Sequence, residues 1–361
     1  MRIAAFSKTW FYLLMGEFYA AFIPGLQNLI ADVIKERLSD VKIHKLLDGA
    51  VLFETGTGYD KLNFFCFNNI FAVISVMDHA DNHVQPKTAL EKHIKAEIKK
   101  NAAGEVVSNN NKKIHTFRIV ASAENIPAAV DEKIRADAES YIFRFSGLKV
   151  NRSLPDTEFW FLFRNERTQK NFSVFMKRLT LRPSREKTLH KGELPPPLAW
   201  TLCRLAHLVH SDTVLDPFCG YGSIPFMALK HFHIKKFIAC DNNREAALYT
   251  IARFNKRKKE DFDFYKGDFS ALPSLVAEKS VDAIVTDPPW GEYREIDKSA
   301  FYKKMFDVFQ KLLKEGGRAV LLCANNDDFL NEVPASFKLE SKTPILLSGK
   351  KAAIFQYFCS C

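Results

Sequence analysis

The stretch Val214-Leu-Asp-Pro-Phe-Cys-Gly-Tyr-Gly-Ser-Ile224 joins a short apolar segment to a glycine loop and then to a helical pattern. This order is typical of the first strand, turn and helix of a doubly wound α/β domain, where ligands bind beyond the carboxyl ends of parallel strands. Gly220 and Gly222 let the backbone turn tightly and approach a ligand where a Cβ would collide. The stretch therefore predicts a nucleoside-binding loop.

The residues around this loop indicate which nucleoside it accepts. The glycine spacing differs from Gly-x-Gly-x-x-Gly, and the neighbours are acidic and apolar, unlike those of a phosphate cradle. NAD and ATP are therefore poor fits. Asp216 can neutralise a cationic amino group, so a ligand with a cationic amino-acid end fits better, and Phe218 and Cys219 are expected to contact it.

Two more acids follow at predicted strand ends. Asp241 and Asn242 close the segment that begins at Phe237, about twenty residues after the glycine loop, where ribose hydroxyls are held in such folds. Asp268 and Phe269 close the next short segment. Each acid alone is more often a helix N-cap or a turn residue. In this order they jointly predict a nucleoside cofactor.

The stretch Thr286-Asp-Pro-Pro-Trp-Gly-Glu-Tyr293 follows an apolar run, 281–285, which predicts a buried strand ending at Asp287. Two prolines stop the strand and turn the Pro288 carbonyl outward. A carboxylate, a fixed carbonyl and the Trp290 ring form a site for a planar amine, which points to a nucleobase. The alternative is a strand exit with a proline turn and a surface tryptophan.

Residues 212–361 resemble the Rossmann-like S-adenosylmethionine-dependent methyltransferases, within them the amino-methylating group with an Asp/Asn-Pro-Pro-aromatic motif. The resemblance implies an α/β fold with a mostly parallel seven-stranded sheet and a terminal antiparallel hairpin. It implies that the cofactor residues are Asp216, Phe218, Cys219, Gly220, Gly222, Asp241, Asn242, Asp268 and Phe269. It implies that the catalytic residues are Asp287, Pro288, Pro289 and Trp290.

In the implied chemistry, the amine donates hydrogen bonds to the Asp287 carboxylate and the Pro288 carbonyl, which localise its lone pair for in-line attack on the sulfonium methyl. Trp290 stacks on the extruded base. A cysteine-dependent C5 methyltransferase is disfavoured because no Pro-Cys pair occurs, and Cys219 and Cys240 occupy positions of packing or cofactor contact.

Composition sets further limits. The chain has 361 residues, enough for two to three domains, and its formal charge of +10 favours a polyanionic partner. The basic runs are Lys256 to Lys259 and a group comprising Arg178, Arg182, Arg185, Lys187 and Lys191. Seven cysteines without Cys-x-x-Cys spacing predict reduced thiols in the cytoplasm and no metal site. The apolar run 10–23 is interrupted by Glu17, so neither a signal peptide nor a membrane span is expected.

The N-terminal half predicts a separate α+β region. The expected strands lie within 10–23 and at 50–54, 70–77, 115–121, 158–164 and 172–178, and the expected helices run from Pro24-Gly25 to Leu38 and over 89–100 and 128–145. This order, with Pro24-Gly-Leu26, Phe117-Arg-Ile-Val120 and Asp156 before a strand, resembles the ferredoxin-like plus THUMP module of RNA-modifying enzymes.

The segment Leu189-His-Lys-Gly-Glu-Leu-Pro-Pro-Pro-Leu-Ala199 resembles the connection between THUMP and catalytic domains in tRNA guanine-N2 methyltransferases, where it starts a helix that covers the cofactor. A flexible proline-rich linker is the alternative, but apolar residues from Trp200 to Leu208 continue at helical spacing. The expected domains are 1–60 (ferredoxin-like), 61–182 (THUMP-like), 183–211 (linker and covering helix) and 212–361 (methyltransferase). Near the C-terminus we expect a helix over 301–312 ended by Gly316-Gly317, a strand over 318–323, and a hairpin over 337–358.

Together these resemblances imply an enzyme that methylates the exocyclic N2 amine of a guanosine in tRNA, of the position 6 or position 10 type. One alternative is a methyltransferase that acts on ribosomal RNA guanine N2 or on adenine N6. The other is an RNA-binding protein whose activity needs a small activating subunit. The sequence leaves the oligomeric state open.

Overall fold

The computed structural model describes residues 16–58, 62, 64–81, 83–100, 114–124, 126–165, 170–180, 189–254, 261–290, 297–324, 327–347 and 349–360. The chain divides into two compact units. Unit 1 comprises Met1–Ala21 and Gln27–Lys187, and unit 2 comprises Phe22–Leu26 and Thr188–Cys361. The four domain limits expected from the sequence stay predictions.

Unit 1 is built on a nine-stranded sheet with the order β2-β3-β1-β4-β9-β8-β5-β6, in which β7 also pairs with β5. Its strands are β1 (Gly16–Ala21), β2 (Lys42–Leu47), β3 (Ala50–Thr55), β4 (Asn69–Asp78), β5 (Thr116–Ala123), β6 (Ile126–Pro127), β7 (Lys149–Val150), β8 (Thr157–Arg164) and β9 (Phe172–Arg178), and its helices are α2 (Gln27–Arg37), α3 (Pro86–Lys100) and α5 (Glu132–Ser146). The sequence did not predict β2, a strand at one end of the sheet in which only Leu47 is buried and the apolar alternation is weak.

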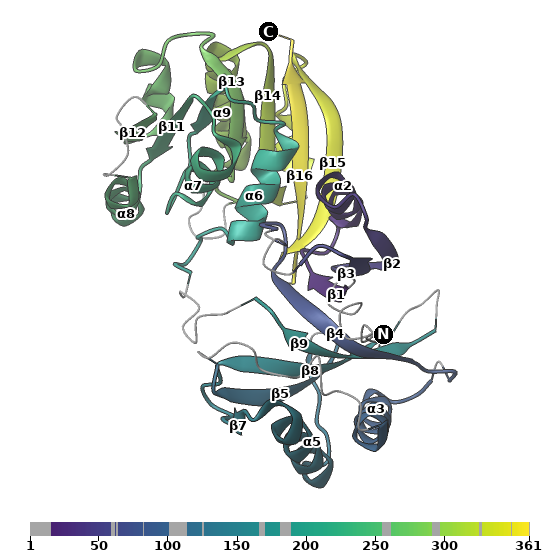
Figure 1. Cartoon of the computed structure of the whole chain (residues 1–361). Helices are drawn as coiled ribbons and strands as arrows, with labels where there is room; N and C mark the ends of the chain where they lie inside the picture. Colours follow the sequence, from purple (N-terminus) through teal and green to yellow (C-terminus); the bar gives the residue numbers. More distant parts are fainter. Residues whose placement is uncertain are drawn as a thin grey trace, which may run out of the picture. The chain divides into compact units, whose positions relative to one another are not determined.

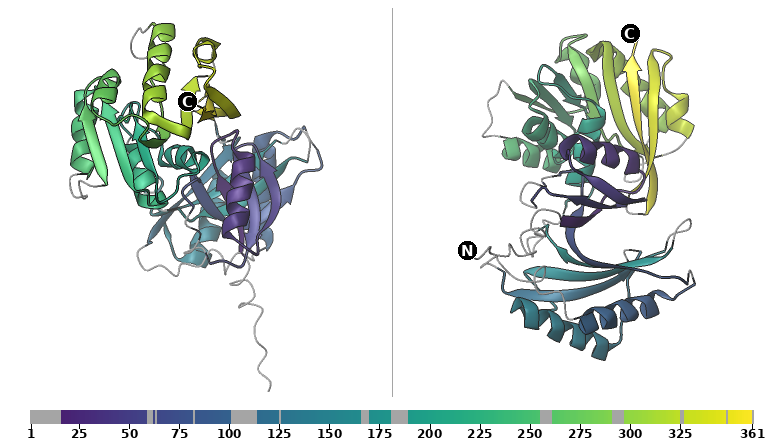
Figure 2. Two further views of the ribbon diagram at one scale, coloured as in Figure 1. Left: turned by 90° about the horizontal axis from the view of Figure 1, so that it is seen from above. Right: turned by 45° about the vertical axis from the view of Figure 1, so that its right-hand side comes forward.

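Helices α3 and α5 cover the same face of this sheet (Figure 1; Figure 2, right). Their apolar residues pack against β5, β8 and β9, where the rings of Phe161 and Phe175 stack with centroids 4.2 Å apart. Helix α5 begins at Glu132, four residues later than expected from 128, because the Asp131 carboxylate caps it by accepting the N–H groups of Lys133 and Ile134.

Unit 2 contains a seven-stranded sheet with the order β12-β11-β10-β13-β14-β16-β15. Its strands are β10 (Thr213–Asp216), β11 (Lys236–Asp241), β12 (Phe262–Lys266), β13 (Val281–Thr286), β14 (Leu313–Ala324), β15 (Phe337–Leu347) and β16 (Lys350–Cys359), and its helices are α6 (Pro196–Leu205), α7 (Ser223–Met227), η2 (Ala228–Phe232), α8 (Arg244–Phe254), η3 (Phe269–Ser274), α9 (Lys298–Leu312) and α10 (Asp327–Asn331). Strands β10 to β14 are parallel, and β16 runs antiparallel to both neighbours. This confirms the predicted fold of the C-terminal half.

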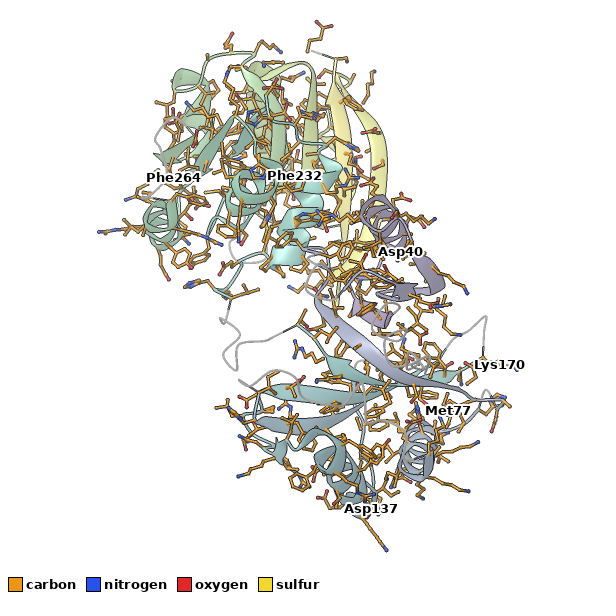
Figure 3. All side chains as sticks on the ribbon, viewed as in Figure 1. Asp40, Met77, Asp137, Lys170, Phe232 and Phe264 are labelled. Atoms are coloured by element: carbon orange, nitrogen blue, oxygen red, sulfur yellow. The ribbon has the colours of Figure 1, made fainter. Side chains whose placement is uncertain are left out.

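Helices lie on both faces of this sheet (Figure 1). On one face, η3, α9 and α10 share a core with Leu215, Ile284 and Leu321 of the central strands. On the other face, α6 packs against β13, β14 and α7. Figure 3 shows the side chains that fill these cores and labels Phe232, whose ring lies 5.9 Å from that of Trp200.

The junction of α9 and β14 corrects one expectation. The helix ends at Leu312 and β14 begins at once with Leu313, so the two glycines do not end the helix. They lie within β14, where the pairing with β13 is irregular between Val281 and Ala283. A Cβ on Gly317 would lie 2.8 Å from the Lys314 carbonyl oxygen, so this bulge requires glycine.

Phe306 is central to the α9 side of the core, and its replacement provides a stability test. Its side chain is fully buried and its ring lies 5.1 to 6.4 Å from those of Phe309, Phe329, Phe337 and Tyr357. We expect Phe306→Ala to lower the free energy of unfolding of unit 2 by about 3–5 kcal/mol, because it leaves a cavity among rigid rings. Urea denaturation followed by circular dichroism measures this loss. Leu339→Ala, at an exposed position in the hairpin, should change stability by less than about 0.5 kcal/mol.

Candidate active site

The sheet order brings the predicted acids together. Strand β10 ends at Asp216, β11 ends at Asp241, and β13 ends at Thr286, directly before Asp287. Because β10 lies between β11 and β13 and all three are parallel, their carboxyl ends meet at one edge of the sheet. This is the edge at which doubly wound folds bind ligands.

Asp216 is buried and only half of its carboxylate is satisfied. Its Oδ1 accepts the Thr286 hydroxyl at 2.6 Å and the Phe218 N–H at 3.1 Å. Its Oδ2 is buried and has no hydrogen-bond partner among the described residues. Burial raises the pKa of Asp216 to about 7, against the effect of the Thr286 bond. An unsatisfied buried carboxylate oxygen favours a cationic ligand at this position.

Asp241 shapes the glycine loop from within. Its carboxylate accepts the Gly220 N–H at 2.7 Å on one oxygen and the Asn243 N–H at 2.7 Å on the other. The Thr250 hydroxyl donates to the Gly220 carbonyl at 2.9 Å. Gly222 has φ +77° and a Cβ there would lie 3.0 Å from Thr250, so the loop needs glycine at this position. Asp241 thus holds the loop, and each of its oxygens keeps a second lone pair for a ligand hydroxyl.

Two of the remaining predicted cofactor residues, Phe218 and Phe269, belong to an aromatic cluster. The rings of Phe218, Phe269 and Phe301 lie 4.9 to 5.6 Å from one another. Asp268 caps η3 by accepting the Ser270 N–H at 2.9 Å, and the hydrogen bonds from Ser270 lower its pKa. Asn242 is exposed, next to Asp241.

Cys219 and Cys240 are buried thiols. Burial raises the pKa of Cys240 to about 12 and that of Cys219 well above its ordinary value. Their sulfur atoms approach the carbonyl oxygens of Gly220 and Gly267 at 3.8 and 3.4 Å. Protonated thiols are poor nucleophiles, which argues further against cysteine chemistry.

Asp287 and Trp290 are in direct contact, which the sequence did not indicate. The Trp290 indole N–H donates to Asp287 Oδ1 at 3.0 Å and to the Leu322 carbonyl at 3.1 Å, and the ring is half-buried. The alternative of a surface tryptophan at a simple strand exit therefore does not describe Trp290, whose ring is half-buried and hydrogen-bonded. Pro288 is buried and Pro289 exposed. Burial raises the pKa of Asp287 to about 8, with a smaller contribution from the charge of Asp216.

The segment that begins at Leu189 packs against the glycine loop. The His190 ring stacks on Tyr221 with centroids 4.2 Å apart and meets Tyr249 edge-on at 4.9 Å. Glu193 accepts the His190 N–H at 3.1 Å and pairs with Arg253 at 3.8 Å. The segment then enters α6 through its prolines. It is therefore an ordered part of unit 2, and the sequence offered no signal for the stack because its partners lie far apart in the chain.

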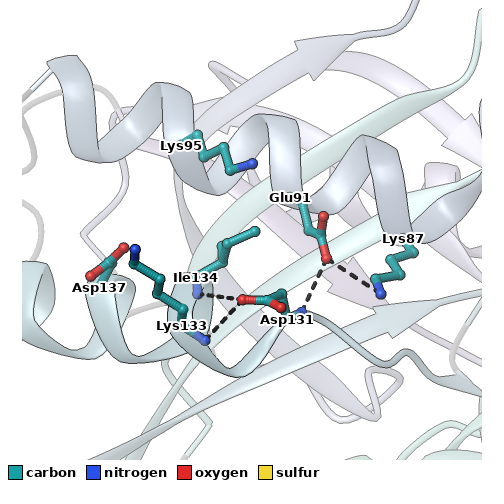
Figure 4. Close-up of a pocket in the computed structure, with 7 residues that line it drawn as sticks. All are labelled: Lys87, Glu91, Lys95, Asp131, Lys133, Ile134 and Asp137. Carbon is teal, nitrogen blue, oxygen red and sulfur yellow. Dashed lines mark hydrogen bonds and ion pairs between the residues drawn. The ribbon is translucent and has the colours of Figure 1, made fainter.

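The predicted basic runs contribute little to the described surface. Arg178 is buried in β9 and pairs with Glu158 at 3.0 Å, so its expected role in an exposed basic run is wrong. Arg182, Arg185, Lys187 and the run 256–259 lie outside the described residues. A cleft of about 450 Å³ between α3 and α5 in unit 1 has lysines and carboxylates in equal number along its wall (Figure 4).

The described residues contain neither a candidate membrane span nor a candidate metal site. No helix there is both long and apolar enough to cross a membrane. In the same residues, no group of three or more His, Cys, Asp or Glu side chains could hold a metal ion.

The burial of Asp216 predicts a pH dependence of stability. Its folded pKa, about 7, lies above the ordinary value of 3.8, so the folded state binds the proton more tightly than the unfolded state. The stabilisation is full below about pH 4 and is lost as pH rises through 7, with a slope of at most about 1.4 kcal/mol per pH unit. Urea titrations of the ligand-free protein between pH 5 and 8 measure this slope. Asp216→Asn should reduce this slope without abolishing it, because the raised pKa of Asp287 gives a slope of the same sign. An equal slope in wild type and variant would exclude a contribution from Asp216.

Comparison with known proteins places this site in a group of relatives. Residues 183–343 match the UPF0020 family, described as RMKL-like, methyltransferase domain. The tRNA (guanine(10)-N2)-dimethyltransferase of Methanocaldococcus jannaschii is 30% identical over 207 residues, which cover 53% of this chain and 56% of that protein. Human U6 snRNA (guanine-N(2))-methyltransferase THUMPD2 is 28% identical over 130 residues, which cover 36% of this chain and 25% of that protein.

A solved structure matches both units in fold. TrmN from Thermus thermophilus superimposes with a TM-score of 0.74 at 21% identity, covering 96% of this chain and 99% of that one. The chain spans about half the length of the archaeal relative. The matched segment includes the glycine loop and the Asp-Pro-Pro-Trp motif. Residues 183–343 therefore resemble a methyltransferase domain, and the chain is similar in sequence to RNA guanine-N2 methyltransferases.

Proposed function

We propose that this protein is an S-adenosylmethionine-dependent methyltransferase that modifies the exocyclic N2 amine of a guanosine in tRNA. The observation that carries the proposal is the gathering of Asp216, Asp241 and Asp287 at the carboxyl edge of one parallel sheet. The methyltransferase match over residues 183–343 supports the reaction class. The activities for which the relatives are named support guanine N2 as the acceptor.

The residues at this edge fit the cofactor. Its amino-acid end carries an ammonium group, which would satisfy the bare Oδ2 of Asp216. The ribose would lie near Asp241 and Asn242, and the adenine near Asp268 and the Phe218 and Phe269 rings. A bound cation also favours the ionised form of Asp216, whose pKa is raised to about 7 without it. The cofactor supplies an electrophilic methyl group on a sulfonium sulfur.

The chain's own residues would hold and orient the acceptor. Asp287 Oδ2 makes no hydrogen bond within the described residues, so it can accept one N–H of the base amine, and the Pro288 carbonyl can accept the other. These two hydrogen bonds would localise the lone pair on the amine nitrogen and orient it toward the methyl carbon. As the N–C bond forms and the methyl carbon–sulfur bond breaks, positive charge develops on nitrogen. The ionised Asp287 would stabilise this charge and could accept the proton that nitrogen then loses. The exposed part of the Trp290 ring would contact the base.

We also propose the RNA substrate, the cellular compartment and the need for a partner subunit. tRNA is preferred as substrate because the similar M. jannaschii protein and mouse tRNA (guanine(6)-N(2))-methyltransferase THUMP3 are both named for activity on tRNA. U6 snRNA is a second candidate because THUMPD2 relatives carry that name. We further propose that the protein acts in the cytoplasm. A small activating subunit would be required if the isolated chain binds RNA without methylating it.

The substrate is tested with a panel of transcripts. Unmodified tRNA, U6 snRNA and a ribosomal RNA helix are incubated with the protein and cofactor, digested, and analysed by nucleoside mass spectrometry. We expect N2-methylguanosine in tRNA, and its loss when the modified guanosine is replaced by inosine, which lacks the N2 amine. N6-methyladenosine in any transcript, or methylation of U6 snRNA alone, would refute the substrate assignment.

A further inference from the structure

The Asp287 carboxylate has two unlike oxygens. Oδ1 accepts the Trp290 indole N–H at 3.0 Å, while Oδ2 has no hydrogen bond among the described residues. The same indole N–H also donates to the Leu322 carbonyl at 3.1 Å, which ties the ring to β14. Because the Leu322 carbonyl holds the indole in place, Asp287 Oδ1 must face the indole N–H to accept its hydrogen bond. This contact fixes the rotation of the carboxylate.

Neither phenylalanine nor tyrosine, the other aromatic residues compatible with the motif, could make this bond. Phenylalanine has no donor, and the tyrosine hydroxyl is at the far end of its ring, whereas the indole N–H lies on the ring edge near the backbone. The structure thus shows a contact that depends on tryptophan in this chain. Stacking on a base would not require it, because every aromatic residue has a ring face.

We propose that Trp290 is a positioning residue for methyl transfer, whose indole N–H holds one oxygen of Asp287 and presents the other to the acceptor amine. This inference rests on the proposed function. A carboxylate free to rotate would offer the amine a distribution of geometries, and small misplacements of a reacting group are costly in rate. The bond also favours the ionised carboxylate, the form that can stabilise the developing positive charge.

The chain provides a matched control. The Trp160 indole N–H donates to the Glu158 carboxylate at 2.9 Å in unit 1, so Trp160→Phe removes the same type of bond in a different domain. The test variants are Trp290→Phe, which removes the donor and shrinks the ring, and replacement of Trp290 by β-(3-benzothienyl)alanine. The second keeps the bicyclic face and puts sulfur in place of N–H.

The experiment is single-turnover methylation of tRNA with saturating protein and cofactor between pH 6 and 9. We expect both Trp290 variants to be at least about 10-fold slower than wild type at pH 7. The acid limb of the pH–rate profile should move to higher pH in both variants. The indole hydrogen bond lowers the pKa of Asp287, so its loss raises that pKa. Trp160→Phe should leave the position of this limb unchanged. Calorimetry with S-adenosylhomocysteine checks that each variant retains the folded cofactor site.

The outcomes separate this inference from the proposed function. If wild type forms N2-methylguanosine but the benzothienyl variant matches its rate at every pH, the indole N–H has no positioning role. If both Trp290 variants slow by the same factor at all pH values, the bond only anchors the loop, and the inference is again refuted. If wild type methylates no guanosine N2, the proposed function fails and the inference fails with it.

Discussion

Asp287→Ala is expected to lower the single-turnover rate of methyl transfer at least about 100-fold, which corresponds to about 2.7 kcal/mol. The carboxylate accepts an N–H from the amine and offsets the charge that develops on nitrogen, and alanine does neither. Asp287 lies beyond the end of β13, and Trp290 keeps its second bond to the Leu322 carbonyl. The loop should therefore remain folded in the variant.

Two controls distinguish chemistry from binding. Affinity for S-adenosylhomocysteine, measured by calorimetry, should change little in Asp287→Ala, since the Thr286 bond to Asp216 is retained. Asp287→Asn keeps the shape and an oxygen that can accept the indole N–H, but removes the charge, so its rate should lie between wild type and alanine. Wild-type turnover in Asp287→Ala would mean that the Asp-Pro-Pro-Trp segment is only a structural turn.

The second large effect concerns the cofactor. Asp216→Asn should weaken S-adenosylhomocysteine binding by about 10- to 100-fold, because a charged hydrogen bond to the ammonium group is replaced by an amide contact. The substitution keeps the volume of the side chain. An asparagine oxygen can still accept the Thr286 hydroxyl and the Phe218 N–H that now bind Oδ1. The loss of affinity can therefore be assigned to the charge.

The pH dependence of the same binding adds an independent check. Because the pKa of Asp216 is raised to about 7, cofactor binding below that pH must expel a proton. Wild-type affinity should rise between pH 6 and 8 and then level off, whereas affinity of Asp216→Asn should be nearly flat. Calorimetry across this range measures both. If wild type and Asp216→Asn bound S-adenosylhomocysteine with equal affinity at pH 8, the ammonium group would bind elsewhere.

The sequence was sufficient for the parts of the site that are local in the chain. Apolar runs ending in Asp216, Asp241 and Asp287 predicted buried strands, and the structure places all three at neighbouring strand ends. Glycines at 220 and 222 predicted a tight loop, and both have positive φ. Strand burial and tight glycine turns depend on residues that are close together in the chain, so the order of residues is sufficient to predict them.

Contacts between distant residues were not predictable in this way. The Trp290 bond to Leu322 and the His190 stack on Tyr221 join segments about thirty residues apart, and nothing in either segment specifies its partner. The sequence placed Arg178 in a basic run. In the structure it is the last residue of β9, and its side chain is buried and pairs with Glu158. Side-chain direction within a sheet depends on register, which a single strand does not specify.

The most direct test of the account is transfer of a labelled methyl group. Wild-type protein, S-adenosylmethionine with a trideuterated methyl group and unmodified tRNA are mixed for a single turnover, and the digested nucleosides are identified by mass spectrometry. We expect trideuterated N2-methylguanosine with wild type, formed at least about 100-fold more slowly by Asp287→Ala. Label in any other nucleoside, or an equal yield from both proteins at early times, would contradict it.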